Sequence, residues 1–281
     1  MEESRILVCT DVHLCHLKFF GWETEARLDR MVSELNTFRE QSPYEKIIFL
    51  GDYSLDYWTW DVKGSYLGQG ISNTDRFVRE YASRLDAPHY LLPGNHEPYG
   101  EENWQKITGC SRRAVFPAGG YLVVCCDNFA GHLDPAEDDD GGYTPTDLAF
   151  VRDAMARYPG LPVILCAHWF DPEKEPDAFY DFLRTEKRIA LLFCGHDHLV
   201  FAEDLGERAG HVWCCHAGHF SYSGAKENKL DVTWGFCDVV LREGGVDVRY
   251  VEPAFDGTLK GEPFRHAYRE QITRFFPRRD V

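Results

Sequence analysis

Six continuous apolar runs alternate with segments of helical periodicity along the first two thirds of the chain. The runs are RILVCT (5–10), KIIFL (46–50), HYLLP (89–93), YLVVCC (121–126), PVILCA (162–167) and IALLFC (189–194). A run that is apolar throughout, rather than at every second residue, predicts a strand covered on both faces. The alternation with helices predicts an α/β fold with a largely parallel sheet.

Three segments between these runs carry apolar residues at helical spacing. The stripes span residues 28–38, 77–85 and 150–155. Asn73–Thr74 and Thr146 are candidate caps for the second and third helices, because short polar side chains satisfy the free N–H groups at a helix start. These stripes indicate helix faces that pack on the core.

The last third of the chain has shorter apolar runs, HVWCCHAG (211–218) and WGFCDVVLREGGVDVRYVEP (234–253). The second predicts a hairpin that turns near Gly244–Gly245. We expect a second, more antiparallel sheet from this part. The chain shows no internal repeat and no linker, so we predict one domain over residues 1–281. It would comprise a first part (1–200), C-terminal strands and hairpin (201–255) and a tail (256–281).

Composition narrows the class of protein. The 281 residues are 44% hydrophobic and 27% charged, as is typical of a globular chain. The formal net charge of -16 disfavours extended nucleic acid and anionic membranes as partners. The N-terminus, MEESRILVCT, lacks signal-peptide features, and no run approaches the roughly 18 apolar residues of a membrane helix. The ten cysteines form no C-x-x-C pair and lie mostly in apolar runs, so we expect reduced thiols in the cytoplasm, with disulfide pairing as the alternative.

Side chains that bind metals follow five of the six apolar runs. The sequences are TDVH (10–13), GD (51–52), GNHE (94–97), AH (167–168) and GHDH (195–198). Each of these short sequences alone is common in turns. The carboxyl ends of parallel strands lie at one edge of a sheet, where α/β proteins bind ligands. The five together therefore predict one functional cleft.

Carboxylate, amide and imidazole ligands without thiolate suit divalent metals such as manganese, iron or zinc. The eight candidate groups are Asp11, His13, Asp52, Asn95, His96, His168, His196 and His198. This number predicts two divalent ions, with manganese preferred and iron or zinc as alternatives, and a carboxylate such as Asp52 can bridge them. A pair of ions lowers the pKa of a shared water and neutralises charge that develops on phosphoryl oxygens.

The ordered motifs D-V-H, G-D, G-N-H-E, A-H and G-H-D-H resemble those of the calcineurin-like metallophosphoesterases over residues 11–198. The resemblance implies a four-layer αββα sandwich of two mixed β-sheets, with a binuclear metal centre at the carboxyl ends of the strands. It implies that one ion is held by Asp11, His13 and His198. The other ion would be held by Asn95, His168 and His196, with Asp52 as the bridge.

The resemblance also implies roles outside the ligand set. His96 matches the family's non-ligand histidine, which contacts the phosphate and can protonate the leaving group. An unperturbed imidazole pKa suits that role near neutral pH. Asp197, between the two histidines of GHDH, is expected to point elsewhere, toward a hydrogen bond on a ligand histidine.

We therefore predict a hydrolase that cleaves phosphoester bonds by attack of a metal-bridging hydroxide on phosphorus. A phosphodiesterase for a small or nucleotide-like substrate is preferred; a phosphatase is the alternative, and a non-catalytic scaffold ranks lower. The motif order is similar to that of class III cyclic-nucleotide phosphodiesterases. The serine/threonine protein phosphatases typically continue the second motif as G-D-x-x-D-R-G, and GDYSLDYWTW (51–60) lacks that arginine.

The roles of two loops and several isolated residues are not settled by these motifs. In the aromatic loop after Asp52, Trp58 and Tyr57 are candidates for stacking on a base or ring of the substrate; the alternative is a loop that packs on its own aromatic residues. The acidic run at 137–140 is expected to be a solvated loop. The pair Arg112–Arg113 is expected at the surface, with a phosphate contact as the alternative. His216 and His219 receive no role.

Overall fold

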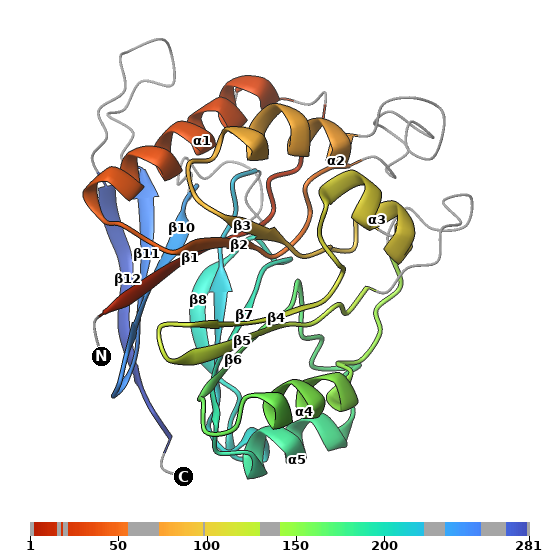
Figure 1. Cartoon of the computed structure of the whole chain (residues 1–281), viewed down its shortest axis with the longest axis vertical. Coiled ribbons are helices and arrows are strands. Elements are labelled where there is room, and N and C mark those ends of the chain that lie inside the picture. The colour runs from red at the N-terminus through yellow and green to blue at the C-terminus, as the bar shows by residue number, and fades with distance from the viewer. Residues whose placement is uncertain are drawn as a thin grey trace.

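The computed structural model describes residues 3–15, 18, 22–55, 73–97, 99–129, 141–221, 234–253 and 268–279. These residues form two six-stranded β-sheets that pack face to face, and helices cover the outer face of each sheet (Figure 1). The predicted four-layer αββα sandwich of two mixed sheets is confirmed.

The first sheet has the strand order β12-β11-β10-β1-β2-β3. Its strands are β1 (Ser4–Cys9), β2 (Lys46–Phe49), β3 (His89–Leu91), β10 (Phe236–Arg242), β11 (Gly245–Pro253) and β12 (Tyr268–Pro277). Strands β1, β2 and β3 are parallel, whereas β10, β11 and β12 continue the sheet as antiparallel neighbours beyond β1. The expected hairpin is present, because Arg242 of β10 pairs with Gly245 of β11.

The second sheet has the strand order β4-β5-β6-β7-β9-β8. Its strands are β4 (Ala114–Ala118), β5 (Tyr121–Cys125), β6 (Val163–Cys166), β7 (Ile189–Cys194), β8 (Val200–Asp204) and β9 (Trp213–Ala217). The four central strands are parallel, and the edge strands β4 and β8 run antiparallel to their neighbours.

The expectation that the last third forms a sheet of its own is wrong. Strands β8 and β9 join the second sheet, while β10, β11 and β12 extend the first. Strand β12 lies in the segment that we expected to be a tail. Its sequence, YREQITRFFP, mixes charged and apolar residues, so it lacks the apolar run that marked the central strands.

The apolar runs explain why the two sheets stack. Ile6 and Val8 of β1 face the other sheet, whereas Leu7 and Cys9 face the helices. Successive strand residues point to opposite faces, so a strand between two layers must be apolar at every position. Each such side chain, once fully buried, contributes about 1.5–3 kcal/mol relative to an exposed one.

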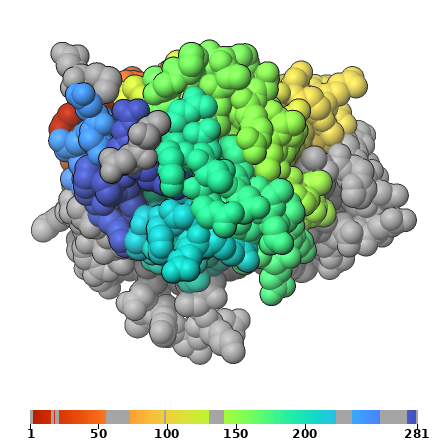
Figure 2. Space-filling view, turned by 90° about the horizontal axis from the view of Figure 1, so that it is seen from below, coloured from red at the N-terminus to blue at the C-terminus, as the bar shows by residue number. Residues whose placement is uncertain are grey.

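The outer layers consist of helices on opposite sides of the molecule. They are α1 (Thr24–Gln41), α2 (Asn73–Arg76) and α3 (Glu101–Thr108) over the first sheet, and α4 (Leu148–Arg157) and α5 (Asp177–Thr185) over the second. Figure 2 shows the second face from outside, with α4 and α5 in green and blue-green beside β12 in dark blue. No helix in the described part of the chain has the length and apolar character needed to cross a membrane.

Two predicted helices differ in detail. The second predicted helix is α-helical only at its start, over α2; the stripe at 77–85 lies in a π-helix (Phe77–Tyr81) and a 3-10 helix (Ala82–Arg84) that follow. For α4 the cap is Asp147, whose carboxylate accepts from the N–H groups of Ala149 and Phe150. Thr146 instead donates its hydroxyl to Glu175 Oε1 at 2.6 Å.

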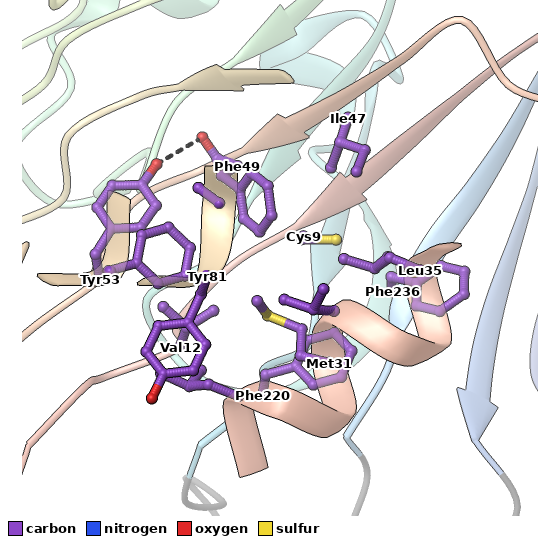
Figure 3. Packing of buried hydrophobic residues seen from close by; sticks show 14 of the residues in the cluster. Cys9, Val12, Met31, Leu35, Ile47, Phe49, Tyr53, Tyr81, Phe220 and Phe236 are labelled. Atoms are coloured by element: carbon purple, nitrogen blue, oxygen red, sulfur yellow. Dashed lines mark hydrogen bonds between the residues drawn. The ribbon is translucent and has the colours of Figure 1, made fainter. Parts of the chain in front are cut away.

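The core beneath α1 also anchors the loops that follow the strands (Figure 3). Met31 and Leu35 of α1 lie in the same cluster as Val12, Tyr53 and Phe220. These three residues follow β1, β2 and β9 in sequence, and each is next to a candidate functional residue or a histidine. Apolar side chains in the loops thus fix the backbone from which the polar side chains project.

Candidate metal centre

The five polar motifs meet at the junction of the two sheets. Asp11, Asp52 and Asn95 follow β1, β2 and β3 of the first sheet. His168 follows β6 of the second sheet, and the GHDH motif at 195–198 follows β7. The predicted convergence at strand ends is therefore found, but the residues come from two sheets rather than from one.

One cluster joins Asp11, His13 and His198. Asp11 Oδ1 lies 3.1 Å from His198 Nε2 and 3.6 Å from His13 Nε2. The Nε2 atoms of the two histidines are 3.1 Å apart. All three side chains are buried and face one point, so this trio can hold one cation.

A second cluster joins Asn95, His168 and His196. Asn95 Oδ1 lies 2.9 Å from His168 Nε2 and 3.0 Å from His196 Nδ1, and these two nitrogens are 3.3 Å apart. Asp52 lies between the clusters, with Oδ2 3.2 Å from His168 Nε2 and 3.6 Å from His13 Nε2. This is the position that a bridging carboxylate requires.

The protonation of His168 tests whether a metal fits. Its Nδ1 lies 2.8 Å from the carbonyl oxygen of Leu50 and donates to it, so Nε2 of the neutral ring presents a lone pair. That lone pair faces Asn95 Oδ1 and Asp52 Oδ2, which are acceptors as well. Acceptors that converge in a buried space are stable when a cation lies among them, and a nitrogen and oxygen set without sulfur suits manganese, iron or zinc.

A proton competes with such a cation for the same lone pair. Burial disfavours the charged ring of His168, but the carboxylates of Asp52 and Asp11 outweigh burial and raise its pKa to about 9. The negative charge of the site therefore attracts either a proton or a metal ion, and ligands release protons when a metal binds.

His96 belongs to neither trio, but its ring converges with His13 and Asp52 on a third group of close ligand atoms. Its Nε2 is 3.7 Å from Asp52 Oδ2, and its backbone N–H donates to Asp52 Oδ1. Burial lowers the pKa of His96 to about 3, against the opposing effect of Asp52. Burial thus favours the neutral ring, and the role expected of His96 stays a prediction.

The backbone is strained where the candidate ligands lie. Five of them have left-handed φ angles, namely Asp11 (53°), His13 (44°), Asp52 (59°), His196 (73°) and His198 (58°). Such residues cost about 1–3 kcal/mol each and persist only where the surroundings enforce them. His211 is the one further non-glycine residue of this kind in the described ranges. The concentration of strain marks this junction as a functional site.

The glycines of the motifs allow the chains to approach closely. A Cβ atom on Gly94 would lie 2.1 Å from Asp52 Oδ1, and one on Gly195 would lie 2.0 Å from Thr10 Oγ1. Any side chain at these positions would displace the carboxylates of the site. The glycines in GNHE and GHDH are therefore required by packing around the ligands.

Glu97 organises the backbone beneath the bridge, a role that the sequence analysis did not assign. Its Oε2 accepts from the N–H groups of Asp52 and Gly94, and its Oε1 from those of Tyr53 and Ser54. The side chain is fully buried. One carboxylate thus satisfies four backbone donors and fixes the loop after β2 against the loop after β3.

Arg27 and His219 support the first cluster from behind. Arg27 extends from α1 and donates to the carbonyl oxygens of Val12, His13 and Phe220, the one to His13 at 2.9 Å. The buried ring of His219 stacks on His198 with centroids 5.4 Å apart. Neither role is visible in sequence, because each depends on segments far apart in the chain.

Three further expectations need correction or stay open. Asp197 does not contact a histidine of the two clusters; its Oδ2 lies 2.7 Å from Nδ1 of His216. Arg112 is not solvated surface but is buried, where it pairs with Asp127 and donates to backbone carbonyls. Trp58 and Tyr57 lie outside the described residues, as does the acidic run at 137–140.

An aromatic wall flanks the second cluster. Trp169 directly follows His168 and stacks on His196 with ring centroids 4.3 Å apart. Phe129 lies 5.5 Å from the His168 ring, and Tyr143 lies 5.8 Å from Trp169. Trp169 is half-buried beside the candidate ligands, and Lys174 Nζ lies 5.9 Å from its ring centroid. The position of Trp169 directly after the A-H motif (167–168) was the signal in the sequence that could have identified it.

A family model supports what the geometry indicates. The model for the calcineurin-like phosphoesterase family matches residues 4–200, which include every candidate ligand. The chain therefore belongs to the calcineurin-like phosphoesterases, and this places it among metal-dependent phosphoesterases in general.

Comparison with solved structures agrees on the fold. A purple acid phosphatase from yellow lupin (Lupinus luteus) seeds is similar at 10% identity with a TM-score of 0.54, over 89% of this chain and 52% of its own. The chain thus spans about half the length of the lupin protein. GAP50, described as the anchor in the inner membrane complex of Plasmodium, is similar at 12% identity with a TM-score of 0.60, over 99% of this chain and 90% of its own. No curated protein sequence matches the chain significantly.

Substitution of Glu97 tests whether this carboxylate supports the site. Glu97→Gln keeps the shape but turns an NH₂ group toward two backbone N–H donors, which leaves both unsatisfied. We expect the free energy of unfolding to fall by about 2–6 kcal/mol, at about 1–3 kcal/mol for each buried donor. We also expect weaker metal binding, because Asp52 loses its fixed backbone. Urea denaturation would measure the loss of stability, and the metal content of the purified protein would measure the weaker binding. The matched control is Glu102→Gln, a substitution at an exposed residue. A Glu97→Gln protein with unchanged stability and metal content would contradict the supporting role of Glu97.

Proposed function

We propose that this chain is a metal-dependent phosphodiesterase that acts on a small or nucleotide-like ester. The observation that carries the proposal is the pair of buried ligand clusters with Asp52 Oδ2 between them, 3.6 Å from His13 Nε2 and 3.2 Å from His168 Nε2. Such an arrangement suits two divalent ions that share a carboxylate and act together at phosphorus.

The ligand roles follow the two clusters. Asp11, His13 and His198 would hold one ion, and Asn95, His168 and His196 the other, with Asp52 common to both. When bound, two divalent ions supply hydroxide near neutral pH and neutralise charge that develops on the phosphoryl oxygens. Manganese is our first choice because the donor set is imidazole, carboxylate and amide; iron and zinc accept the same donors.

His96 is proposed to contact the substrate. It is buried beside Asp52, its ring lies 5.1 Å from that of His13, and it belongs to neither trio. A histidine at this position can donate an N–H to a phosphoryl oxygen held between the clusters. That contact would orient the phosphorus and stabilise negative charge as the ester bond breaks.

The charge around the site favours a diester over a monoester. Within the described residues, Asp11 and Asp52 form ion pairs with histidines alone. The two buried arginines near the site are occupied elsewhere, since Arg27 donates to backbone carbonyls and Arg112 pairs with Asp127. Arginine forks recognise phosphate groups bidentately, and a monoester dianion carries more charge to neutralise than a diester, which carries one. The two ions and His96 suffice for that charge.

The aromatic wall supports a substrate with a ring. Trp169 is half-buried beside His196, with Lys174 Nζ 5.9 Å from its ring centroid, and bases stack on aromatic side chains regardless of their identity. The predicted stacking role of Trp58 and Tyr57 stays a prediction.

Hydrolysis after metal exchange tests the proposed function. We expect chelated protein to be inactive and manganese to restore turnover of bis-p-nitrophenyl phosphate in preference to p-nitrophenyl phosphate. Asn95→Ala should lower this rate by more than about 100-fold, because loss of a direct ligand exceeds the 10–100-fold effect of groups that only orient ligands. Asn36→Ala, on the outer side of α1 where Asn36 donates to the carbonyl of Arg84, is the matched control and should retain activity.

The other outcomes of this assay would overturn the proposal in distinct ways. Preference for the monoester would make the protein a phosphatase. Absence of turnover with manganese, iron and zinc, despite bound ions, would make it a binding scaffold. Full activity of Asn95→Ala would remove Asn95 from the ligand set.

A pair of esters with one leaving group tests the stacking role of Trp169. Thymidine 5′-p-nitrophenyl phosphate and methyl p-nitrophenyl phosphate differ only in the alcohol that stays on phosphorus. We expect Trp169→Ala to lower kcat/KM for the thymidine ester about tenfold more than for the methyl ester, since stacking contributes about 1–3 kcal/mol per base. Trp169→Phe should retain most of the difference. Equal losses for both esters would show that Trp169 only supports His196.

A further inference from the structure

A second group of metal-ligating side chains lies on the strand pair β7–β9 and the turn after β7. Cys194 Sγ is 3.5 Å from Cys214 Sγ and 3.5 Å from His216 Nδ1. Asp197 Oδ2 is 2.7 Å from the same nitrogen. Both cysteines and the histidine are buried, at 1%, 2% and 7% exposure. None of the four residues belongs to the two clusters described above.

The strand register explains why these atoms converge. Strands β7 and β9 are parallel neighbours, and Cys194 lies opposite His216. Cys214 precedes His216 by two residues, so the two side chains point to the same face of the sheet. The turn at Gly195 then returns the chain so that Asp197 reaches His216.

The spacing fits a tetrahedral ion. With Zn–S of about 2.3 Å and Zn–N of about 2.0–2.1 Å, ligand atoms in a tetrahedron lie about 3.5–3.8 Å apart. The Sγ–Sγ and Sγ–Nδ1 distances are both 3.5 Å. Asp197 Oδ2 is 2.7 Å from Nδ1, closer than the roughly 3.3 Å between nitrogen and oxygen ligands of one tetrahedral ion, so this carboxylate must move away from the ring when the ion binds. Asp197 is the most exposed member, at 26%, and lies on the side from which an ion enters.

The surroundings of His216 suit a metal ligand. Glu203 Oε1 lies 3.2 Å from Nε2 and can accept its proton, while Nδ1 faces both the Cys194 thiol and the Asp197 carboxylate. An ion bound here takes the place of a proton on Nδ1. A carboxylate on the second ring nitrogen is the usual partner of a metal-bound histidine. Phe201 stacks on the ring at a centroid distance of 3.8 Å and fixes its plane.

We propose that Cys194, Cys214, His216 and Asp197 form a structural zinc site, separate from the binuclear centre. The two thiols lose their protons to solvent when the ion binds. Thiolates select zinc over manganese, so the two sites differ in the metals that they prefer. Asp197 lies between His196 and His198, and zinc would therefore fix the turn that carries one ligand of each cluster.

Cobalt substitution tests this site without relying on activity. Reduced, chelated protein titrated with Co²⁺ should develop a near-ultraviolet thiolate-to-cobalt charge-transfer band that saturates at one ion per chain. The binuclear centre has only nitrogen and oxygen donors, so it does not contribute to this band. Cys214→Ala should abolish the band. Cys215→Ala, on the same strand but facing the other sheet, is the matched control and should retain it.

The wild-type protein and the Asp52→Asn variant decide the question if Cys214→Ala fails to fold. A band of the expected stoichiometry that persists in Asp52→Asn, where the binuclear centre is impaired, would support the proposal. Absence of the band in reduced wild-type protein would overturn it. In that case His216 is an imidazolium held between Asp197 and Glu203, and the thiols are ordinary core residues.

Discussion

The burial of two carboxylates and several imidazoles at one junction is the constraint on which the rest of the structure depends. Each charge removed from water costs several kcal/mol unless partners compensate for it. The compensation is local: Asp11 and Asp52 lie among histidines, and Glu97 collects four backbone N–H groups below them. Left-handed backbone and glycines at close contacts bring these groups within reach of one another. A pair of divalent ions would complete the neutralisation.

Much of this arrangement could be predicted because it is encoded locally. The six apolar runs correspond to β1, β2, β3, β5, β6 and β7, and polar residues end five of them. A strand buried on both faces needs no polar residue at its end, so Asp11, Asn95 and His168 stand out against that background. The division of the ligands into two trios came from the resemblance to a family, and the two observed clusters have the same membership.

The features that could not be predicted from the sequence depend on contacts between distant segments. Arg27 donates to carbonyls 15 and 193 residues away, a relation that no local pattern records. Strands β4, β8 and β12 did not stand out in the sequence, because a proline interrupts β4 (AVFPA) and charged residues interrupt β8 (VFAED) and β12 (YREQITRFFP). The pKa of His96 departs from its ordinary value because the ring is buried, and burial of a single loop histidine cannot be read from its neighbours in sequence.

The central claim is that the two clusters hold two metal ions with Asp52 between them. Anomalous diffraction from crystals of the manganese-loaded protein tests it most directly. We expect two peaks per chain, one beside Asp11, His13 and His198 and one beside Asn95, His168 and His196, with the Asp52 carboxylate in contact with both. A single peak, or peaks away from these side chains, would contradict it.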